Sequence, residues 1–376
     1  MSSRADVVIV GGGVMGCAVA LRLAQRGTAV VVIERGVPGA EASSAAAGIL
    51  GPQLEAERDG PFLDLGLRSR ALYPALAAEL RERAGIDIGY VESGVLLAAL
   101  TDDEGRALAD RGAWQIARGL RVEHLGPDAL RRLEPAICPS AVGALRFPDD
   151  AQVNPRELAR ALSQAAAVAG ARFVQGRYVR RVATAAGAVT GVELDGETMP
   201  AGAVVVAAGS WSALVEGAGV PPVAVRPARG QMVQMETRPP LFRSVISSLN
   251  AGYVVPRPDG TVLAGSTLEM VGFRKEVTVA GLAGILACAQ TLVPALAGAS
   301  VTGMWSNFRP YTEDHLPVLG PTPVRGLHLA TGHFRNGILL APITAQIIAE
   351  LLTEGRCSLD IASYSVARFR GGSDAR

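Results

Sequence analysis

Two stretches at the start of the chain decide its fold. Asp6-Val-Val-Ile-Val10 runs directly into Gly11-Gly-Gly-Val-Met-Gly16, and Ala29-Val-Val-Val-Ile-Glu34 follows a helical stretch at residues 17–25. The β-branched runs before the glycines and before the final glutamate are typical of buried parallel strands. A strand, a glycine-rich turn, a helix and a second strand make a βαβ unit, which predicts an α/β fold built on a parallel sheet.

Three glycines in the turn carry the G-x-G-x-x-G spacing of a dinucleotide-binding fold. Gly11 permits the tight turn, Gly13 lets backbone approach a pyrophosphate, and Gly16 lets the helix pack on the strand. The helix N-terminus then faces the phosphates with its N–H groups and its dipole. Glu34 is placed to accept hydrogen bonds from the adenosine ribose and would repel a 2′-phosphate, which disfavours NADP. The motif alone does not separate FAD from NAD.

The composition excludes several classes of partner. The chain has 376 residues, 49% of them hydrophobic, and a formal net charge of +1, which gives no electrostatic reason to expect nucleic acid or an anionic membrane. No run reaches the roughly 18 apolar residues of a membrane span, so we expect a cytoplasmic protein. The spacing of the cysteines and histidines predicts no metal site. A homo-oligomer is left open. The cysteines are Cys17, Cys138, Cys288 and Cys357.

The rest of the chain predicts two kinds of sheet. A helix over residues 155–169 has Asn154 as its N-cap and Gly170 after its end, and helical patterns also cover residues 63–83 and 102–118. Strands are expected at 171–175, 179–184, 189–194 and 203–207. Between about residues 222 and 304, β-runs broken by Gly and Pro predict an antiparallel sheet, with strands at 230–235, 252–255 and 262–266.

Further segments resemble the D-amino-acid-oxidase superfamily of flavoproteins, and within it the glycine oxidases associated with thiamine biosynthesis. The most specific is Gly332-His-Phe-Arg-Asn-Gly-Ile-Leu-Leu340, and the similarity extends over nearly the whole chain. The other matching segments are Ala42-Ser-Ser-Ala-Ala-Ala-Gly-Ile-Leu50, Val204-Val-Val-Ala-Ala-Gly-Ser-Trp211, Arg229-Gly-Gln231, Tyr253-Val-Val-Pro256 and Asn307-Phe-Arg-Pro310.

The resemblance implies a two-domain α/β (α+β) protein that binds FAD. It implies a discontinuous Rossmann-like FAD-binding domain, residues 1–85, 146–222 and 305–376, and an antiparallel-sheet substrate domain, residues 86–145 and 223–304. Some relatives tether FAD through a cysteine near the position of Arg309; no cysteine lies there, so we expect non-covalent FAD. Motif and resemblance together place on FAD the residues Gly11, Gly13, Val14, Met15, Gly16, Glu34, Arg35, Ala42, Ser43, Ala47, Gly48, Ile49, Val179, Gly209, His333, Phe334, Arg335, Asn336, Gly337, Ile338 and Leu339.

The resemblance also implies a substrate site. Arg309 matches the family's carboxylate-binding arginine, whose guanidinium offers two parallel donors; the alternative is an ordinary surface arginine. Tyr253 matches a tyrosine whose hydroxyl reaches the same carboxylate; the alternative is a tyrosine that caps the sheet core. Arg335, in the flavin-facing loop, would touch substrate, flavin or a backbone carbonyl. His333 is expected to orient that loop and not to act as a base.

Two positions near this site bear on the substrate. Glycine oxidases can carry a histidine two residues before the tyrosine, and this chain has Ala251 there, which leaves the exact substrate open. Leu268 corresponds to an apolar wall of the family's pocket.

The predicted function is FAD-dependent oxidation of glycine, sarcosine or small D-amino acids. Hydride transfer from Cα to flavin N5 would give an imine, and O₂ would take the electrons to form H₂O₂. A dehydrogenase of the same fold that passes electrons to a quinone or protein acceptor, as in hydrogen-cyanide-synthase subunits, is the nearest alternative. An NAD-dependent dehydrogenase that shares only the βαβ unit, and a non-catalytic flavin-binding protein, are the others.

Overall fold

The βαβ unit forms as predicted. In the computed structural model, which describes residues 5–250 and 252–372, β1 (Ala5–Val10), α1 (Val14–Gln25) and β2 (Val30–Glu34) follow one another. β1 and β2 pair in parallel, with Val7 opposite Val30. Along the order β17-β18-β11-β1-β2-β8 the β17–β18 pair is antiparallel and the other pairs are parallel. Two further strands extend the same sheet from β11: β10 (Ala188–Leu194) pairs antiparallel with β11, and β9 (Val179–Ala185) pairs antiparallel with β10. The other strands of the sheet are β8 (Arg172–Gln175), β11 (Glu197–Val206), β17 (Val318–Pro321) and β18 (Leu327–Thr331).

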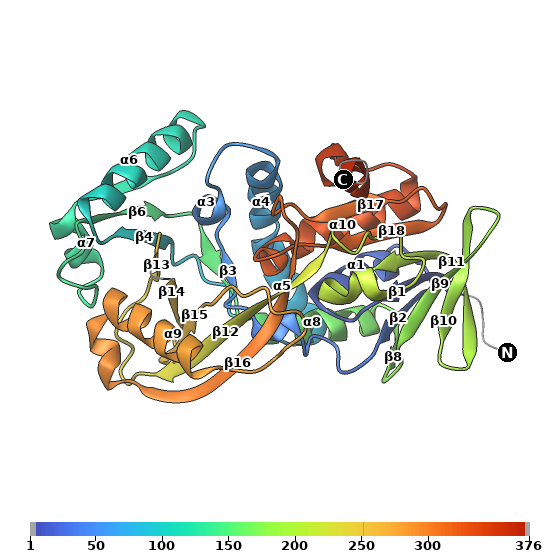
Figure 1. Cartoon of the computed structure of the whole chain (residues 1–376), viewed down its shortest axis with the longest axis horizontal. Coiled ribbons are helices and arrows are strands. Elements are labelled where there is room, and N and C mark those ends of the chain that lie inside the picture. Colours follow the sequence, from blue (N-terminus) through green and yellow to red (C-terminus); the bar gives the residue numbers. More distant parts are fainter. Residues whose placement is uncertain (1–4, 251, 373–376) are drawn as a thin grey trace.

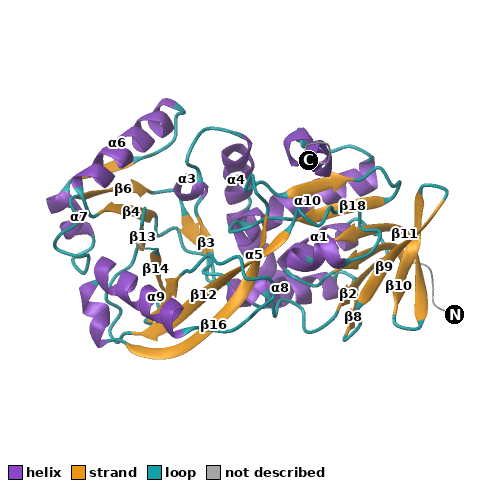
Figure 2. Cartoon of the chain, in the orientation of Figure 1, coloured by secondary structure: helices purple, strands orange, loops and turns teal. Residues whose placement is uncertain are grey.

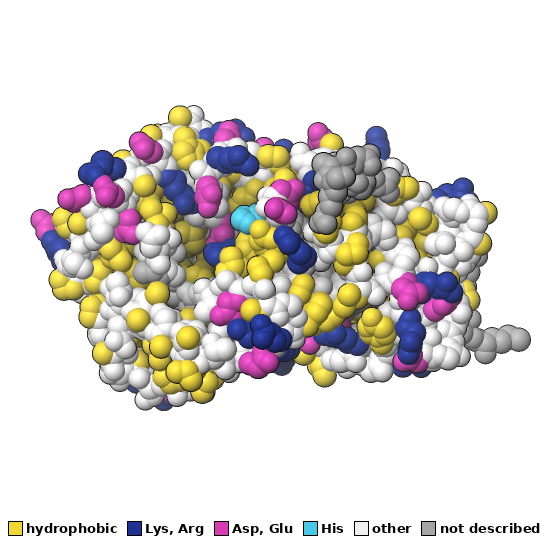
Figure 3. All heavy atoms as spheres, in the orientation of Figure 1, with side chains coloured by type: hydrophobic (Ala, Val, Ile, Leu, Met, Phe, Trp, Pro, Cys, Tyr) yellow, Lys and Arg dark blue, Asp and Glu magenta, His cyan; other side chains and the backbone are white. Residues whose placement is uncertain are grey.

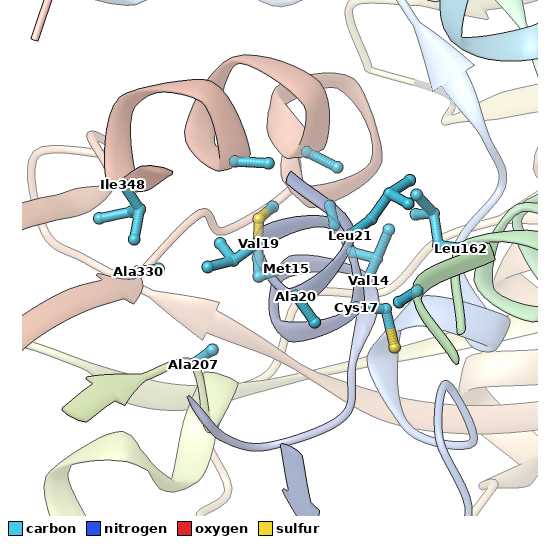
Figure 4. Packing of buried hydrophobic residues seen from close by; sticks show 14 of the residues in the cluster. Val14, Met15, Cys17, Val19, Ala20, Leu21, Leu162, Ala207, Ala330 and Ile348 are labelled. Carbon is cyan, nitrogen blue, oxygen red and sulfur yellow. The ribbon is translucent and has the colours of Figure 1, made fainter. Parts of the chain in front are cut away.

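Three helices pack together on this sheet. α1 contacts both α8 (Pro155–Val168) and α10 (Gly337–Glu354), and Figure 4 shows the side chains of α1 lying among those of its neighbours. Leu21 of α1 and Leu162 of α8 are almost completely buried. The Asn154 side chain accepts hydrogen bonds from the first N–H groups of α8, as predicted. This packing fixes the glycine turn at the carboxyl end of β1.

A second sheet is formed by later parts of the chain. Its order is β16-β12-β15-β14-β13-β4-β6-β5, and all neighbours pair antiparallel except β13 and β4. The predicted antiparallel sheet is therefore mixed, because β4 and β13 come from distant segments that no hairpin connects. Its strands are β4 (Val95–Ala99), β5 (Glu123–Leu125), β6 (Gly143–Phe147), β12 (Arg226–Glu236), β13 (Val245–Ser248), β14 (Tyr253–Pro256), β15 (Thr261–Gly265) and β16 (Ser300–Tyr311).

The two sheets lie toward opposite ends of the molecule, and the long strands β12 and β16 run from the second toward the first (Figure 1). Helices α6 (Asp102–Ala117) and α9 (Val279–Leu292) contact the second sheet (Figure 2). Two strands, β6 and β16, continue across the expected domain boundaries at residues 146 and 305. The division into two discontinuous domains stays a prediction.

The helical pattern at residues 63–83 is two helices in the structure. α4 (Pro61–Ala71) ends at Leu72, and α5 (Tyr73–Ala84) begins directly after it. Pro74 explains the break, because proline has no N–H to donate back to the preceding turn. The remaining elements are α2 (Ala42–Ala45), β3 (Ile49–Leu50), α3 (Pro52–Glu55), α7 (Pro127–Leu133), β7 (Ala151–Gln152), η1 (Gly209–Leu214), η2 (Pro294–Gly298), η3 (Ala362–Tyr364) and η4 (Val366–Gly372).

The surface and the one long apolar helix bear on the predicted partners. Charged side chains of both signs are interspersed over the face shown in Figure 3. Among the described residues one helix, α10, is long and apolar enough to cross a membrane by length and composition, and 67% of it is buried inside the protein. Such burial is what a core helix of a globular domain has.

Candidate active site

A long cavity lies between the two sheets. Its volume is about 1710 Å³ including open solvent, and both sheets contribute to its wall. Gly16 and Leu339 do not line it: Gly16 lies behind the glycine turn and Leu339 is buried beside α4. The other residues predicted to bind FAD or to hold the substrate carboxylate do line it, namely Gly11, Gly13, Val14, Met15, Glu34, Arg35, Ala42, Ser43, Ala47, Gly48, Ile49, Val179, Gly209, Tyr253, Arg309, His333, Phe334, Arg335, Asn336, Gly337 and Ile338.

The turn after β1 has a shape that requires glycine at two positions. Gly11 has a φ of 103°, and a Cβ there would lie 2.7 Å from the carbonyl oxygen of Ala207. A Cβ on Gly16 would overlap the carbonyl oxygen of Gly11. The N-terminus of α1 therefore sits directly on the turn. Its N-cap residue, Gly13, has no side chain to cap it, and the Ser43 hydroxyl accepts a hydrogen bond from Val14 N at 2.9 Å. A helix N-terminus at a cavity wall fits a pyrophosphate.

Glu34 lies at the wall next to this turn. Its carboxylate accepts a hydrogen bond from Gly12 N at 2.7 Å and another from Gly36 N at 2.8 Å. These backbone donors hold the carboxylate where the ribose hydroxyls of an adenosine would reach it. The neighbouring Arg35 stacks its guanidinium on the Trp211 ring, 3.8 Å from the ring centroid.

Small residues form another part of the wall. Gly48 has a φ of 84°, and a Cβ there would overlap the carbonyl oxygen of Val153. Together with Ala45, Ala46 and Ala47 it presents backbone and methyl groups to the cavity. A wall of this kind lets a planar ring approach the chain closely.

The loop before α10 also faces the cavity. Phe334 has a φ of 47°, in the left-handed region, and its N–H donates to the carbonyl oxygen of Pro310 at 3.0 Å. α10 begins at Gly337 without a side-chain cap, after Asn336. Its N-terminus therefore offers positive potential to this part of the cavity, and that favours negative charge on a bound flavin.

His333 is buried behind this loop. Its Nε2 is 3.0 Å from the Thr344 hydroxyl, and burial lowers the pKa of the imidazole to about 3. A neutral, hydrogen-bonded imidazole suits the expected role in orienting the loop.

Arg309 projects from β16 into the cavity. Its Nη1 donates to the carbonyl oxygen of Thr267 at 3.0 Å, and its Nη2 donates to the hydroxyl of Ser266 at 2.5 Å. Burial lowers the pKa of the guanidinium below its usual value. Within the part of the chain that the structure describes, no carboxylate lies within 4.0 Å of it. The guanidinium is thus a half-buried cation whose hydrogen-bond partners are neutral, while the charge of Glu55 acts on it from beyond that distance.

Tyr253 and Arg335 lie in the same cavity. The Tyr253 hydroxyl is 3.3 Å from the sulfur of Met232 and also interacts with the Arg309 guanidinium. Arg335 is exposed, 5.5 Å from the Phe334 ring centroid, and its charge acts on Arg309. Leu268 is 46% exposed and does not line the cavity.

Several cavity residues had no signal in the sequence analysis. Gly230 and Met232 lie on β12, and Ser266 follows β15. Arg177 and Tyr178 lie near Val179, at the end of the cavity where Glu34 lies. The Arg229-Gly-Gln231 segment matched the family but indicated no role for Gly230 itself. The contact of Gly230 with Arg309 depends on the pairing of β12 with β16. Ala251 lies outside the described residues.

The cysteines take no part in the cavity. None of the four, all within the described ranges, lines it. Cys17 donates to the carbonyl oxygen of Gly12, and burial, helped by Glu34, raises the pKa of its thiol to about 12. The same described ranges hold no group of three or more His, Cys, Asp or Glu placed to bind a metal ion.

Comparisons with known proteins agree with this geometry. The family model described as "DAO: FAD dependent oxidoreductase" matches residues 6–351. The glycine oxidase of Geobacillus kaustophilus is 40% identical over 99% of each chain, and a crystal structure of glycine oxidase from that organism superposes with a TM-score of 0.94 over 97% of this chain and 99% of that one. The hydrogen cyanide synthase subunit HcnC of Pseudomonas aeruginosa is 33% identical over 98% of this chain and 97% of its own.

The chain belongs to the DAO family of FAD-dependent oxidoreductases. The predicted cofactor, the predicted fold class and the predicted class of enzyme, an FAD-dependent amino-acid oxidase, are confirmed. An NAD-dependent dehydrogenase that shares only the βαβ unit is excluded, because the family match extends far beyond that unit. The cradle at Gly11 and Gly16, the helix N-termini of α1 and α10 and the wall of small residues at Gly48 fit FAD.

Proposed function

We propose that this enzyme oxidises glycine, sarcosine or small D-amino acids. One observation carries the proposal: the half-buried guanidinium of Arg309 donates to neutral groups, and no carboxylate of the described chain lies within 4.0 Å of it. The charge of Glu55, which also lines the cavity, acts on it only from farther away. A partly desolvated charge without a close ion-pair partner is costly, and a substrate carboxylate would lower that cost while binding in a bidentate geometry. The names of the glycine oxidases among its relatives support the same substrate class.

The chain's own residues have to hold and orient this substrate. Arg309 and the Tyr253 hydroxyl hold the carboxylate, so that Cα faces the wall formed by Ala46 to Gly48. Bound FAD supplies the hydride acceptor, and O₂ takes the electrons to give H₂O₂. Water then hydrolyses the imine product to the 2-oxo acid and ammonia or an amine. Orientation of the reacting atoms supplies a large part of such a rate enhancement.

No protein base is required by this arrangement. His333 is neutral and already hydrogen-bonded to Thr344. An amino-acid substrate with a neutral amine loses the hydrogen on Cα as a hydride, so no protein group has to accept a proton from Cα. Arg309, Tyr253 and Arg335 would therefore act by position and charge.

The nearest alternative is a dehydrogenase of the same fold. The similarity to the HcnC subunit favours it, since that relative belongs to a hydrogen cyanide synthase. Steady oxygen uptake with substrate would favour the oxidase, and flavin reduction by substrate with negligible oxygen uptake would favour the dehydrogenase.

Anaerobic bleaching of the bound flavin tests the substrate class directly. Glycine, sarcosine and paired D- and L-amino acids are mixed with the holoenzyme, and we expect bleaching by glycine, sarcosine and small D-amino acids. Failure of all of them, with dithionite still bleaching the flavin, would overturn the proposal. A cytoplasmic location and a homo-oligomer are parts of the proposal that fractionation and light scattering test separately.

A further inference from the structure

Two side chains from the second sheet hold the segment from Ala45 to Gly48, here called the flavin-facing segment, by its backbone carbonyls. The indole Nε1 of Trp305 donates to the carbonyl oxygen of Ala45 at 3.0 Å. The guanidinium Nη2 of Arg257 donates to the carbonyl oxygen of Ala47 at 2.6 Å. These two donors lie 260 and 210 residues away along the chain from the carbonyls that they hold.

Holding the carbonyls also orients the opposite edge of the same peptide groups. The peptide bonds after Ala45 and Ala47 are trans, so each N–H points away from its carbonyl. The N–H groups concerned belong to Ala46 and Gly48, and both residues line the cavity. A carbonyl drawn toward Trp305 or Arg257 therefore turns an N–H group the other way.

Arg257 brings charge as well as a hydrogen bond. Its Nη1 donates to the Gln152 side-chain oxygen at 2.5 Å, and a Cβ on Gly48 would lie 3.1 Å from its Nη2. Burial lowers the pKa of the guanidinium to about 10, so it stays protonated at neutral pH. No carboxylate within the described ranges lies within 4.0 Å of it. A cation without a close ion-pair partner, on which the charge of Asp259 acts only from farther away, thus stands directly behind the cavity wall.

The same two strands carry the substrate anchors. Arg257 follows β14, which begins with Tyr253, and Trp305 precedes Arg309 on β16. One rigid piece of sheet therefore places both the carboxylate site and the flavin-facing segment.

We propose that Arg257 and Trp305 are positioning residues for FAD: they hold the segment from Ala45 to Gly48 so that its N–H groups and the Arg257 charge favour the reduced cofactor. Reduction adds negative charge to the flavin, and fixed positive dipoles and charges stabilise that state more than the oxidised one. This inference rests on the FAD cofactor and does not depend on which amino acid is the substrate.

The test is the midpoint potential of bound FAD, measured against reference dyes with dithionite and without substrate. Arg257→Met removes the charge and both hydrogen bonds, and Trp305→Phe removes the indole N–H together with part of the ring. In each variant we expect the affinity for reduced FAD to fall about tenfold more than that for oxidised FAD, which lowers the potential by about 30 mV. Arg257→Lys keeps the charge and should retain most of the wild-type potential.

Matched controls separate this role from a structural one. Trp114→Phe removes an indole N–H in α6, outside the cavity, and Arg238→Met removes an exposed charge. Both should leave the potential unchanged. A wild-type potential in either Arg257→Met or Trp305→Phe, whatever the loss of FAD occupancy or thermal stability, would overturn the proposal. Failure of amino acids to reduce a flavin with the expected potentials would count against the proposed substrate alone.

Discussion

The guanidinium of Arg309 occupies the space that a side chain on Gly230 would need. The two residues lie on paired strands, β16 and β12, and a Cβ built on Gly230 would overlap the guanidinium. Glycine at this position therefore lets the arginine lie flat against β12, with its donors toward Ser266, Thr267 and the cavity. The proposed carboxylate site therefore depends on the absence of a side chain at Gly230.

Gly230→Ala should displace Arg309 and weaken substrate binding without loss of FAD. Overpacking costs about 1–3 kcal/mol, and about 1.4 kcal/mol is a tenfold change, so we expect KM for glycine to rise roughly tenfold or more. Gly284→Ala in α9 is the matched control, because a Cβ there meets nothing within 4 Å. Steady-state kinetics measure KM for both variants, with FAD occupancy checked by absorbance. An unchanged KM in Gly230→Ala would show that Arg309 does not bind substrate from this position.

FAD should be released when the protein is unfolded. No cysteine lines the cavity, and the thiol nearest the glycine turn, Cys17, is buried with a pKa raised to about 12. Acid precipitation should therefore leave the yellow colour in the supernatant. Colour that stays with the pellet would mean a covalent link through some other residue.

Stability should depend on pH through His333. In the folded protein its pKa is about 3, against 6.5 for an ordinary histidine, so below pH 6.5 the unfolded chain binds a proton that the folded chain does not. Stability is therefore lost as the pH falls. Between about pH 7.5 and about pH 5 the loss due to this residue is about 2 kcal/mol.

Urea unfolding of the holoenzyme at the two pH values measures this effect. His333→Gln should lose about 2 kcal/mol less than the wild type between them. His124→Gln, at an exposed position, is the control and should behave as the wild type. An equal loss in His333→Gln and wild type would mean that the imidazole is protonated, or solvated, in the folded enzyme.

D-Alanine should reduce the flavin faster than L-alanine. In the proposed site Arg309 and Tyr253 fix the carboxylate, hydride transfer fixes the Cα–H bond, and the amine occupies a third direction. One direction at Cα then remains for a side chain. The resemblance to D-amino-acid oxidases implies that the side chain of a D-amino acid, and not that of an L-amino acid, fits in that direction. Stopped-flow reduction with the two enantiomers measures it: a faster L-form reverses the assignment, and equal rates mean that the carboxylate is not held by this pair.

The parts of the fold that sequence analysis predicted are those with local signals. The β1–α1–β2 unit follows from a glycine spacing and two β-branched runs, and α8 from its caps at Asn154 and Gly170. The parallel pairing of β13 with β4 and the contact of Gly230 with Arg309 depend on strand register between distant segments. The hydrogen bonds of Trp305 and Arg257 go to backbone carbonyls, which every residue carries, so no residue type marks their partners.

The proposed function depends on recognition of the substrate carboxylate by Arg309. Removing one partner of a desolvated charge pair costs about 2–5 kcal/mol, so Arg309→Ala should lower kcat/KM for glycine roughly 30- to 4,000-fold. Arg180→Ala, at an exposed position, should not. FAD should stay bound in both variants.

Anaerobic flavin reduction by glycine and by glycinamide tests this claim most directly, because glycinamide has a neutral amide in place of the carboxylate. The wild type should prefer glycine at least about 30-fold, and Arg309→Ala should lose that preference to within about threefold, as a coupled pair requires. If Arg309→Ala keeps the wild-type preference for glycine over glycinamide, the carboxylate is bound elsewhere in the cavity and the account is contradicted.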